Sequence, residues 1–382
     1  MATEYIPPPV EGTDATAILH IDLAAVAANW QALCRRAAPG AVAAAVKADA
    51  YGLGAARVAP HLHAAGCRHF FAAHLSEAVA LRPLLPGAML APLNGPPPGS
   101  ERDHLEHDIL PVLGSLDDID RWTALARSIG RRLPALLHVD TGMHRLGLDK
   151  AGLAVLAADP GRLDGLTLRY VLTHLVASEQ PDDPVNAAQL ERFAAACAVL
   201  PPAPRSIANS SGLFLNACFA SDLARPGAAL YGINPTPGRE NPMRLPVRLH
   251  ARILQVREIA AGDSVGYNAT WRAPRPSRIA TLGIGYADGW RRALSSGAPS
   301  GRVLAAWPAS PGFDGPPVPL VGRVSMDLTT CDVTDHPALA PGDWLELMGP
   351  RCPPEHLAAA CGTNAYEILT SLSPRIARTY SA

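Results

Sequence analysis

The sequence predicts an α/β fold: a (β/α)8 barrel of the TIM type, followed by a C-terminal domain that is mostly β. Eight short apolar segments recur between residues 40 and 232, and helical patterns separate most of them. After residue 244 the apolar residues alternate with polar ones, which is typical of half-buried strands. The pattern changes near Pro242–Pro246. We therefore divide the 382-residue chain into a barrel domain, 1–243, and a β domain, 244–382.

The eight segments are interpreted as buried parallel strands. Several are rich in alanine, which favours helices, but burial in a sheet overrides that local preference. The predicted strands are residues 41–46, 69–75, 88–94, 108–113, 134–140, 166–174, 205–211 and 223–232.

The helices of the barrel are predicted from apolar residues spaced three to four apart. Ser76 and Ser115 are the expected N-caps of two of them. A doubly wound open sheet is the alternative fold, but it would normally have a glycine-rich turn after its first strand, and none opens this region. The predicted helical segments are 55–66, 76–85, 116–130 and 186–200.

The second domain begins with alternation over 247–256, where Val247, Leu249, Ala251 and Ile253 are separated by polar residues. Proline- and glycine-rich turns separate the later strand-like segments. These segments are 278–287, 302–307, 318–333 and 343–349, and helical pattern returns at 356–362 and 365–373.

Composition restricts the classes of function. With 48% hydrophobic residues and a net charge of −1, the chain is globular and lacks the basic excess that attracts nucleic acid or an anionic membrane. The N-terminus does not read as a signal peptide, and no apolar run is long enough to span a membrane. The seven cysteines stand singly, which favours neither disulfides nor a zinc site. We expect a cytoplasmic protein with no metal.

Reactive residues follow five of the eight predicted strands. In a parallel barrel, functional side chains gather at the carboxyl ends of the strands, so these residues should surround one mouth. Each is ordinary by itself, and the prediction depends on their joint position. They are Lys47 and Tyr51; His138, Asp140 and Arg145; Thr173 and His174; Asn209 and Ser210; and Arg225, Gly227 and Ala228.

Together these residues indicate a phosphate-bearing aldehyde cofactor. A lysine in a partly desolvated mouth has a lowered pKa, which favours its reaction with a carbonyl group. N–H groups near Ser210 and Gly227–Ala228, with the Tyr51 hydroxyl, could bind the phosphate. Arg225 could meet a pyridine nitrogen, and it stays charged, so it can only donate.

Ordered motifs over residues 15–380 resemble the alanine racemase family. The segment AVKADAYGLG (45–54) is similar to the cofactor-lysine signature of that family. The other matching segments, in the family's order, are HVDTGMHRLG (138–147), THLVAS (173–178), IANSSG (207–212), RPGAALYG (225–232), SVGYNATW (264–271), GIGYADGW (283–290) and GRVSMD (322–327).

The resemblance implies a pyridoxal 5'-phosphate enzyme and a homodimer whose active sites combine residues of both subunits. Lys47 and Tyr267 of the partner subunit would be the two catalytic acid/bases, on opposite faces of the substrate. Arg145 and the backbone of Met326 would bind the substrate carboxylate. The implied cofactor-binding residues are Lys47, Tyr51, His174, Asn209, Ser210, Arg225, Gly227 and Ala228.

The implied function is that of an isomerase that interconverts L-alanine and D-alanine and supplies D-alanine for cell-wall peptidoglycan. A broad-specificity or serine-preferring racemase is the first alternative, since one methylene changes selectivity by only about 1–3 kcal/mol. A pyridoxal-phosphate decarboxylase or D-amino-acid lyase is the second, and a non-catalytic pyridoxal-phosphate-binding protein the third.

Four residues depart from the family pattern. His138 stands where many members have a lysine. Ser206 stands where many members have a histidine that bonds the arginine equivalent to Arg225. Ser325 replaces a frequent cysteine, and Pro374 aligns with a tyrosine that some members use for phosphate. The first two leave open how Arg145 and Arg225 are held in this chain.

Overall fold

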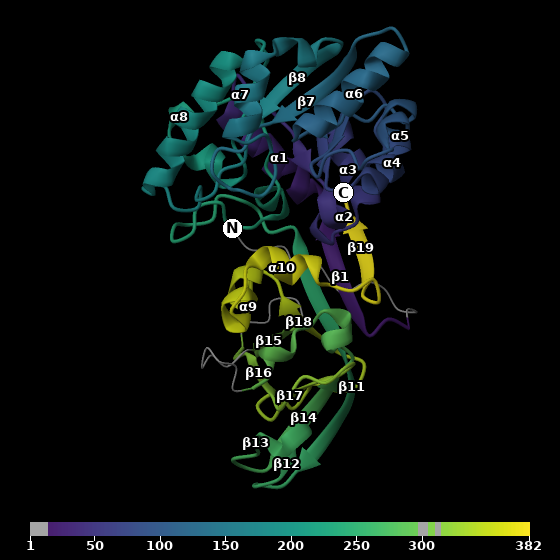
Figure 1. The fold of residues 1–382 in the computed structure, drawn as a ribbon. Helices are drawn as coiled ribbons and strands as arrows, with labels where there is room; N and C mark the ends of the chain where they lie inside the picture. The colour runs from purple at the N-terminus through teal and green to yellow at the C-terminus, as the bar shows by residue number, and fades with distance from the viewer. Residues whose placement is uncertain (1–13, 297–304, 310–314) are drawn as a thin grey trace. The chain divides into compact units, whose positions relative to one another are not determined.

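The computed structural model describes residues 14–296, 305–309 and 315–382, and these form two compact units (Figure 1). One unit consists of Ala25–Arg244. The other consists of the described residues up to Ala24 together with Leu245–Ala382. The chain passes between the units inside Pro242–Pro246, where the sequence pattern changes.

Every predicted strand segment of the first unit contains a strand, and all the pairings between these strands are parallel. The first segment contributes two short strands. The strands are β2 (Ala41–Val42), β3 (Ala44–Ala45), β4 (His69–Ala72), β5 (Met89–Pro92), β6 (Val112–Leu113), β7 (Leu133–His138), β8 (Leu166–Leu172), β9 (Arg205–Ser206) and β10 (Leu223–Ala224).

The strands close into a ring. The regular pairings give three sheets, β10-β2, β3-β4-β5 and β6-β7-β8-β9. Single backbone bonds join them: Leu110 N donates to Leu90 O (2.9 Å) between β5 and β6, and Arg225 N donates to Ala208 O (2.8 Å) between β9 and β10. The predicted barrel is therefore confirmed, with all its strands ending at one mouth.

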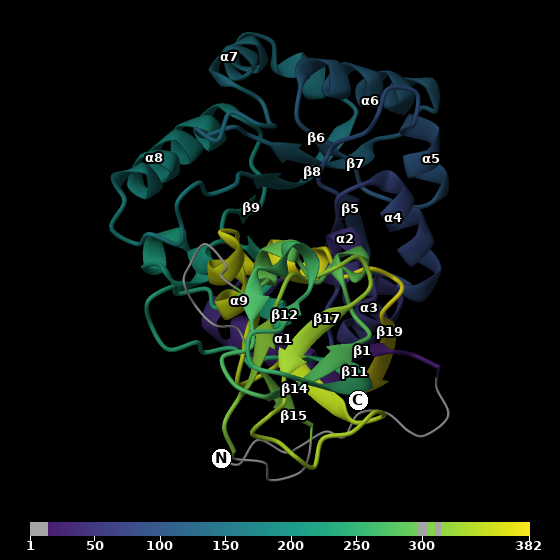
Figure 2. The ribbon, with the colours of Figure 1, turned by 90° about the horizontal axis from the view of Figure 1, so that it is seen from below.

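Helices surround the ring, and in Figure 2 α4 to α8 form an arc outside strands β5 to β9. The four predicted helices are present. Ser115 caps α6 by accepting from Asp118 N (3.1 Å), as expected. The expectation for Ser76 is wrong: α4 begins at Leu75, because Glu77 accepts from the His74 amide and starts the helix earlier. The helices are α1 (Leu23–Ala37), α3 (Ala55–Ala64), α4 (Leu75–Leu81), α5 (Glu101–Glu106), α6 (Leu116–Ser128), α7 (Lys150–Ala158) and α8 (Pro184–Val199).

The unit has two layers of core. The barrel interior is filled by side chains from successive strands: Ala43, Phe71, Ala91, Val112, Leu136, Leu172 and Leu223. A larger cluster lies between β6–β9 and the helices outside them, with Trp122 of α6 and Phe193 of α8 at 2% and 1% exposure. The alanine-rich strands thus supply the small interior residues of a packed barrel, which explains why they do not form helices.

The second unit is built on one eight-stranded sheet of order β14-β17-β16-β15-β18-β11-β1-β19. A further pairing of β14 with β11 closes six of these strands into a ring. Its elements are β1 (Ala17–Asp22), β11 (Val247–Ile259), β12 (Ser264–Val265), β13 (Trp271–Arg272), β14 (Ser277–Leu282), β15 (Ala305–Pro308), β16 (Val318–Val321), β17 (Thr329–Asp332), β18 (Trp344–Met348), α9 (Pro354–Cys361), α10 (Ala365–Thr370) and β19 (Ala377–Ser381). Residues 302–304 of one predicted strand lie outside the described residues.

The N-terminal strand differs from the sequence-based division, which put residues 1–243 in one domain. Strand β1 lies between two strands of the second unit, antiparallel to β11 and parallel to β19. Ile18 is opposite both His250 and Ala377. The partners are more than 200 residues away, and local periodicity carries no information about them.

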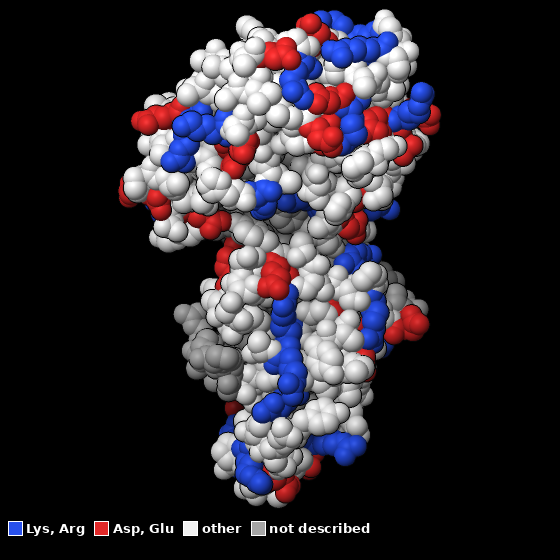
Figure 3. Space-filling view, viewed as in Figure 1, with Lys and Arg blue, Asp and Glu red and all other residues white. Residues whose placement is uncertain are grey.

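Acidic and basic side chains lie interspersed over the barrel unit on the face shown in Figure 3. In the described part of the chain, no helix is long and apolar enough to cross a membrane.

Candidate active site

Lys47 follows β3 at the mouth of the barrel, and the chain after it makes a left-handed turn, α2 (Lys47–Tyr51). Ala48, Asp49, Ala50 and Tyr51 have φ angles between 52° and 58°. Each such residue costs about 1–2 kcal/mol, since its Cβ approaches a carbonyl oxygen. The turn therefore requires specific hydrogen bonds, and Gly52 N to Ala48 O (2.8 Å) is one of them.

The environment of Lys47 suits a nucleophilic amine. Its side chain is half-buried. Burial lowers the pKa of Lys47, the positive charge of Arg145 lowers it further, and the negative charge of Glu77 opposes both effects. A larger fraction of the amine is thus unprotonated at neutral pH than for an exposed lysine.

Tyr51, Ser210 and Gly227 meet on one side of the mouth. A Cβ at residue 227 would lie 2.2 Å from the Tyr51 hydroxyl oxygen, so only glycine fits. Ser210 Oγ accepts from Gly227 N and Ala229 N, both at 3.1 Å. Burial raises the pKa of Tyr51 to about 12, so its hydroxyl remains a donor. We call the group of Tyr51, Ser210, Gly227 and Ala228 the cradle; its hydroxyl donors are those of Tyr51 and Ser210.

Asn209 supports the cradle from within its own loop. Its Oδ1 accepts from Gly212 N (2.8 Å) and from Ser178 Oγ (2.9 Å). Asn209 therefore fixes the turn that presents Ser210.

Arg225 is buried beside the cradle, with 6% exposure. Its guanidinium donates to Ser206 Oγ and to Thr173 O, and Ser206 Oγ donates to Leu223 O (2.6 Å). Burial lowers the pKa of Arg225 to about 10, which still leaves it cationic at neutral pH. Ser206 is thus a hydrogen-bond acceptor for Arg225 and answers how this arginine is held without the histidine that is common in the family.

Arg145 is exposed on the loop after β7. Asp140 organises that loop: its Oδ1 accepts from Gly142 N and Met143 N, both at 2.9 Å, and from His144 N at 3.2 Å. Burial would raise the pKa of Asp140, but these bonds and His144 lower it below the usual value. The carboxylate is therefore ionised and holds the loop at neutral pH.

His138 and His174 are uncharged in this mouth. Burial lowers the pKa of His138 to about 4 and that of His174 to about 3. The positive charges of Arg225, Arg145 and Lys47 lower the pKa of His174 further. Two neutral imidazoles beside three basic side chains give the mouth a basic excess over Glu77 and Asp140, which favours an anionic ligand.

Gln189 of α8 joins the loops under His174. It is fully buried, accepts from Val176 N (2.8 Å), and donates to Thr141 Oγ1 and His174 O (both 3.0 Å). Thr141 Oγ1 is in turn 2.7 Å from Thr173 Oγ1. The ends of β7 and β8 are therefore held by one satisfied polar network.

Tyr267 and Met326 belong to the second unit. Their loops are adjacent. Gly266, next to Tyr267, lies so close to the loop of Met326 that a Cβ at Gly266 would be 3.0 Å from Arg323 N. Met326 O accepts from Ala287 N (2.9 Å). Both side chains project into solvent, with 66% exposure for Tyr267 and 54% for Met326.

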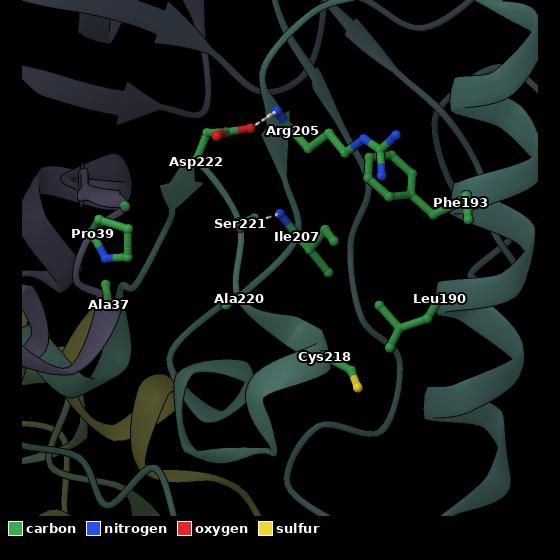
Figure 4. Close-up of a pocket in the computed structure, with 12 residues that line it drawn as sticks. Ala37, Pro39, Leu190, Phe193, Arg205, Ile207, Cys218, Ala220, Ser221 and Asp222 are labelled. Carbon is green, nitrogen blue, oxygen red and sulfur yellow. Dashed lines mark hydrogen bonds between the residues drawn. The ribbon is translucent and has the colours of Figure 1, made fainter.

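A separate cavity of about 500 Å³ lies at the opposite ends of the barrel strands (Figure 4). It is lined by Phe193 of α8, the start of β9 at Arg205 and the residues before β10, and Asp222 accepts from Arg205 N (2.6 Å). None of the predicted site residues lines it. Within the described residues no cluster of His, Cys, Asp or Glu could hold a metal ion.

The residues at the mouth fit a phosphate-bearing aldehyde cofactor. The glycine at 227 leaves room against Tyr51, the hydroxyls of Tyr51 and Ser210 can donate to a phosphate, and Lys47 suits a carbonyl.

Comparison with known proteins decides the family. The family model described as "Alanine racemase, N-terminal domain" matches residues 21–235, and "Alanine racemase, C-terminal domain" matches 246–380. The alanine racemase of Acidiphilium cryptum is 58% identical over 360 residues, covering 94% of this chain and 97% of that protein. The chain belongs to the alanine racemase family.

Solved structures agree with this assignment. The alanine racemase of Bartonella henselae, with covalently bound pyridoxal phosphate, is 42% identical with a TM-score of 0.89, covering 96% of this chain and all of that one. The biosynthetic alanine racemase of Pseudomonas aeruginosa is 33% identical with a TM-score of 0.84, covering 96% and 100%. The predictions of the family, the fold class and the isomerase class are confirmed, and the family uses pyridoxal phosphate, as predicted.

Sequence reasoning missed two residues of the site. Glu77 bonds the loop of Lys47, and Gln189 bonds the loop of His174. A glutamate at the third position of a helix after a strand is a weak signal that could have indicated Glu77. Gln189 lies in a helix and carries no such signal.

Proposed function

We propose that this chain is an alanine racemase that interconverts L-alanine and D-alanine with pyridoxal 5'-phosphate attached to Lys47. The observation that carries the proposal is the joint placement of Lys47, Arg145 and Arg225 around a phosphate cradle at one end of the barrel. The relatives at up to 58% identity support alanine as the substrate.

The sequence supports Lys47 as the attachment site in a second way. The chain has only two lysines, Lys47 and Lys150. Lys150 is exposed at the start of α7, whereas Lys47 is half-buried at the mouth. A cofactor that requires a lysine amine thus has one suitable residue.

The cradle would hold the cofactor's phosphate through Tyr51, Ser210, Gly227 and Ala228. When bound, the cofactor acidifies the substrate α-hydrogen by conjugation with its ring. Arg225 would donate to the ring nitrogen and, being cationic, would keep that atom unprotonated. His174, neutral and half-buried, would line the ring.

Inversion requires that one proton leaves one face of the α-carbon and another arrives on the opposite face. Lys47 Nζ would exchange the proton on the D face, and the hydroxyl of Tyr267 of the partner subunit would exchange it on the L face. Two bases on opposite faces avoid the movement across the ring that a single base would need.

The substrate carboxylate would bind Arg145 and the N–H of Met326 of the partner subunit. Arginine binds carboxylates through paired N–H groups, which also fixes their orientation. The ionised Asp140 would hold the loop of Arg145 in position for that role.

A homodimer with shared active sites is part of the proposal. Tyr267, Tyr286, Met326 and Leu328 of the second unit are 66%, 42%, 54% and 39% exposed. Large apolar side chains exposed together are typical of interaction surfaces. We further propose a cytoplasmic enzyme that supplies D-alanine for peptidoglycan; the biosynthetic Pseudomonas aeruginosa racemase supports that role.

A chiral assay tests the function. Protein loaded with pyridoxal phosphate is given L-alanine, D-alanine or serine in separate reactions. Both alanine samples should converge on an equal mixture, and faster than serine does. Preference for serine would favour the alternative racemase, and unchanged alanine with bound cofactor would favour a decarboxylase, a lyase or a binding protein. Lys47→Ala should abolish conversion, whereas Lys150→Ala should leave it unchanged.

A further inference from the structure

The carboxylate of Glu77 joins the loops that follow two neighbouring strands. Its Oε1 accepts from Ala48 N (2.7 Å), directly after Lys47. Its Oε2 accepts from Ala73 N (2.7 Å) and His74 N (3.2 Å), at the start of α4. One side chain therefore binds three backbone N–H groups, and the first of them is adjacent to Lys47.

Packing contributes little at the start of the turn, the part that Glu77 holds. Ala48 and Asp49 are exposed, and neither has the conformational freedom of glycine at its positive φ. Inside the turn, Ala50 N donates to Val46 O (2.9 Å) and Gly54 N donates to Asp49 O (2.9 Å). Asp49 Oδ1 accepts from Ala55 N (2.7 Å) and fixes the far end. Glu77 supplies a side-chain bond from outside the turn at its near end, next to the backbone bond from Val46 N to Phe71 O.

We infer that Glu77 is a positioning residue for Lys47: it pins the left-handed turn to the next loop and so fixes where the Lys47 amine lies at the barrel mouth. This inference rests on the proposed role of Lys47. Charge-assisted bonds to backbone N–H groups are among the stronger hydrogen bonds in proteins, which suits a carboxylate for this task.

Glu77 also acts on Lys47 through its charge. The charged groups that act on the lysine are Arg145 from the loop after β7 and Glu77 from α4, and Lys47 in turn acts on His174 from the loop after β8. Glu77 is the acidic group in this set, and His174 is neutral. Removal of its charge should therefore lower the pKa of Lys47 further.

Amide hydrogen exchange measures how firmly Glu77 holds the turn after Lys47. Full-length protein loaded with pyridoxal phosphate is compared as wild type, Glu77→Gln and Asp118→Asn. Asp118 is a matched control, because it accepts from Gly114 N (2.9 Å) in the loop before its own helix and has no bond to the Lys47 turn. Exchange of the peptide that contains Ala48 should be about tenfold faster in Glu77→Gln and unchanged in Asp118→Asn.

Two outcomes of this experiment would overturn the inference. One is exchange in Glu77→Gln that equals wild type over residues 46–54. The other is an equal increase over the whole barrel, because Glu77 would then stabilise the fold generally rather than the Lys47 turn.

The reactivity of the Lys47 amine supplies a readout that a merely structural role would not move. Cofactor-free full-length protein is acetylated across a pH series, and mass spectrometry follows Lys47, with Lys150 as the internal reference. The midpoint for Lys47 should move to lower pH in Glu77→Gln, while that of Lys150 stays constant. In Glu77→Asp, which keeps the charge but loses reach, the midpoint should move less although exchange is still faster. If the midpoint for Lys47 is equal in wild type, Glu77→Gln and Glu77→Asp, the inference is wrong.

Borohydride trapping separates this inference from the proposed function. Reduction of the loaded wild-type protein should leave the cofactor on the Lys47 peptide. Cofactor on the Lys150 peptide would refute the proposed role of Lys47 whatever Glu77 does. Cofactor on Lys47 with no change in exchange or midpoint would leave the proposed function intact and refute the role of Glu77.

Discussion

Ser206 decides how Arg225 is held in this chain. A histidine is common at this position in the family, and a serine is too short to reach far into the mouth. In this chain the Arg225 guanidinium donates directly to Ser206 Oγ, and the Ser206 hydroxyl donates to Leu223 O (2.6 Å). The arginine is therefore fixed by a hydroxyl that cannot itself gain a charge.

Replacement of Ser206 by alanine tests this arrangement. The variant leaves a buried guanidinium N–H without its acceptor, which should lower the free energy of unfolding by about 1–3 kcal/mol. It should also shift the absorbance band of the bound cofactor, since the proposed contact of Arg225 with the ring nitrogen would be weakened. Denaturant unfolding and absorbance spectra measure the two effects.

Ser221→Ala is the matched control. Ser221 Oγ also donates to Leu223 O (3.3 Å) and accepts from Ile207 N (3.2 Å), but it has no bond to Arg225. It should lose stability without a spectral shift. Equal spectra for the two variants would mean that Ser206 does not position Arg225.

At the scale of elements, the sequence predicts the barrel well but not the connections that shape its mouth. Every predicted barrel strand is present, because continuous apolar segments between helical patterns have few other solutions. The left-handed turn after Lys47 was not predicted. Left-handed residues are usually signalled by glycine or asparagine, and the segment KADAY (47–51), with its two alanines, gives little sign of them.

Helix α8 organises the loops after β7 and β8 through Gln189. Gln189→Leu, of similar volume, should leave Val176 N and His174 O without partners. The free energy of unfolding should fall by at least about 2 kcal/mol. Because Thr141 and Thr173 are in the same network, and Thr173 O accepts from Arg225, the dissociation constant of pyridoxal phosphate should rise about tenfold.

Urea unfolding and a cofactor titration measure these quantities, with Glu191→Leu as control. Glu191 is exposed on the same helix. Its replacement should change neither quantity appreciably. If cofactor affinity is unchanged in Gln189→Leu, the network supports the fold without positioning the site.

At the scale of the whole molecule, sequence reasoning succeeded with local patterns and failed with distant partners. Strand β1 was not predicted, and its place between β11 and β19 depends on residues more than 200 positions away. The exposure of Tyr267 and Met326 is likewise a property of the folded unit. Motif resemblance could name those two residues, whereas periodicity could not show that they project into solvent.

In the proposed dimer, one active site combines Lys47 of one subunit with Tyr267 of the other. Heterodimers of Lys47→Ala and Tyr267→Phe subunits, purified through two different tags, test it most directly in the chiral alanine assay. Each variant should be inactive alone. The heterodimer contains one site with both residues intact, so it should recover about half the wild-type rate per dimer. No recovery in verified heterodimers would mean that the active site is not shared in this way, and full activity of Tyr267→Phe alone would mean that Tyr267 is not the second acid/base.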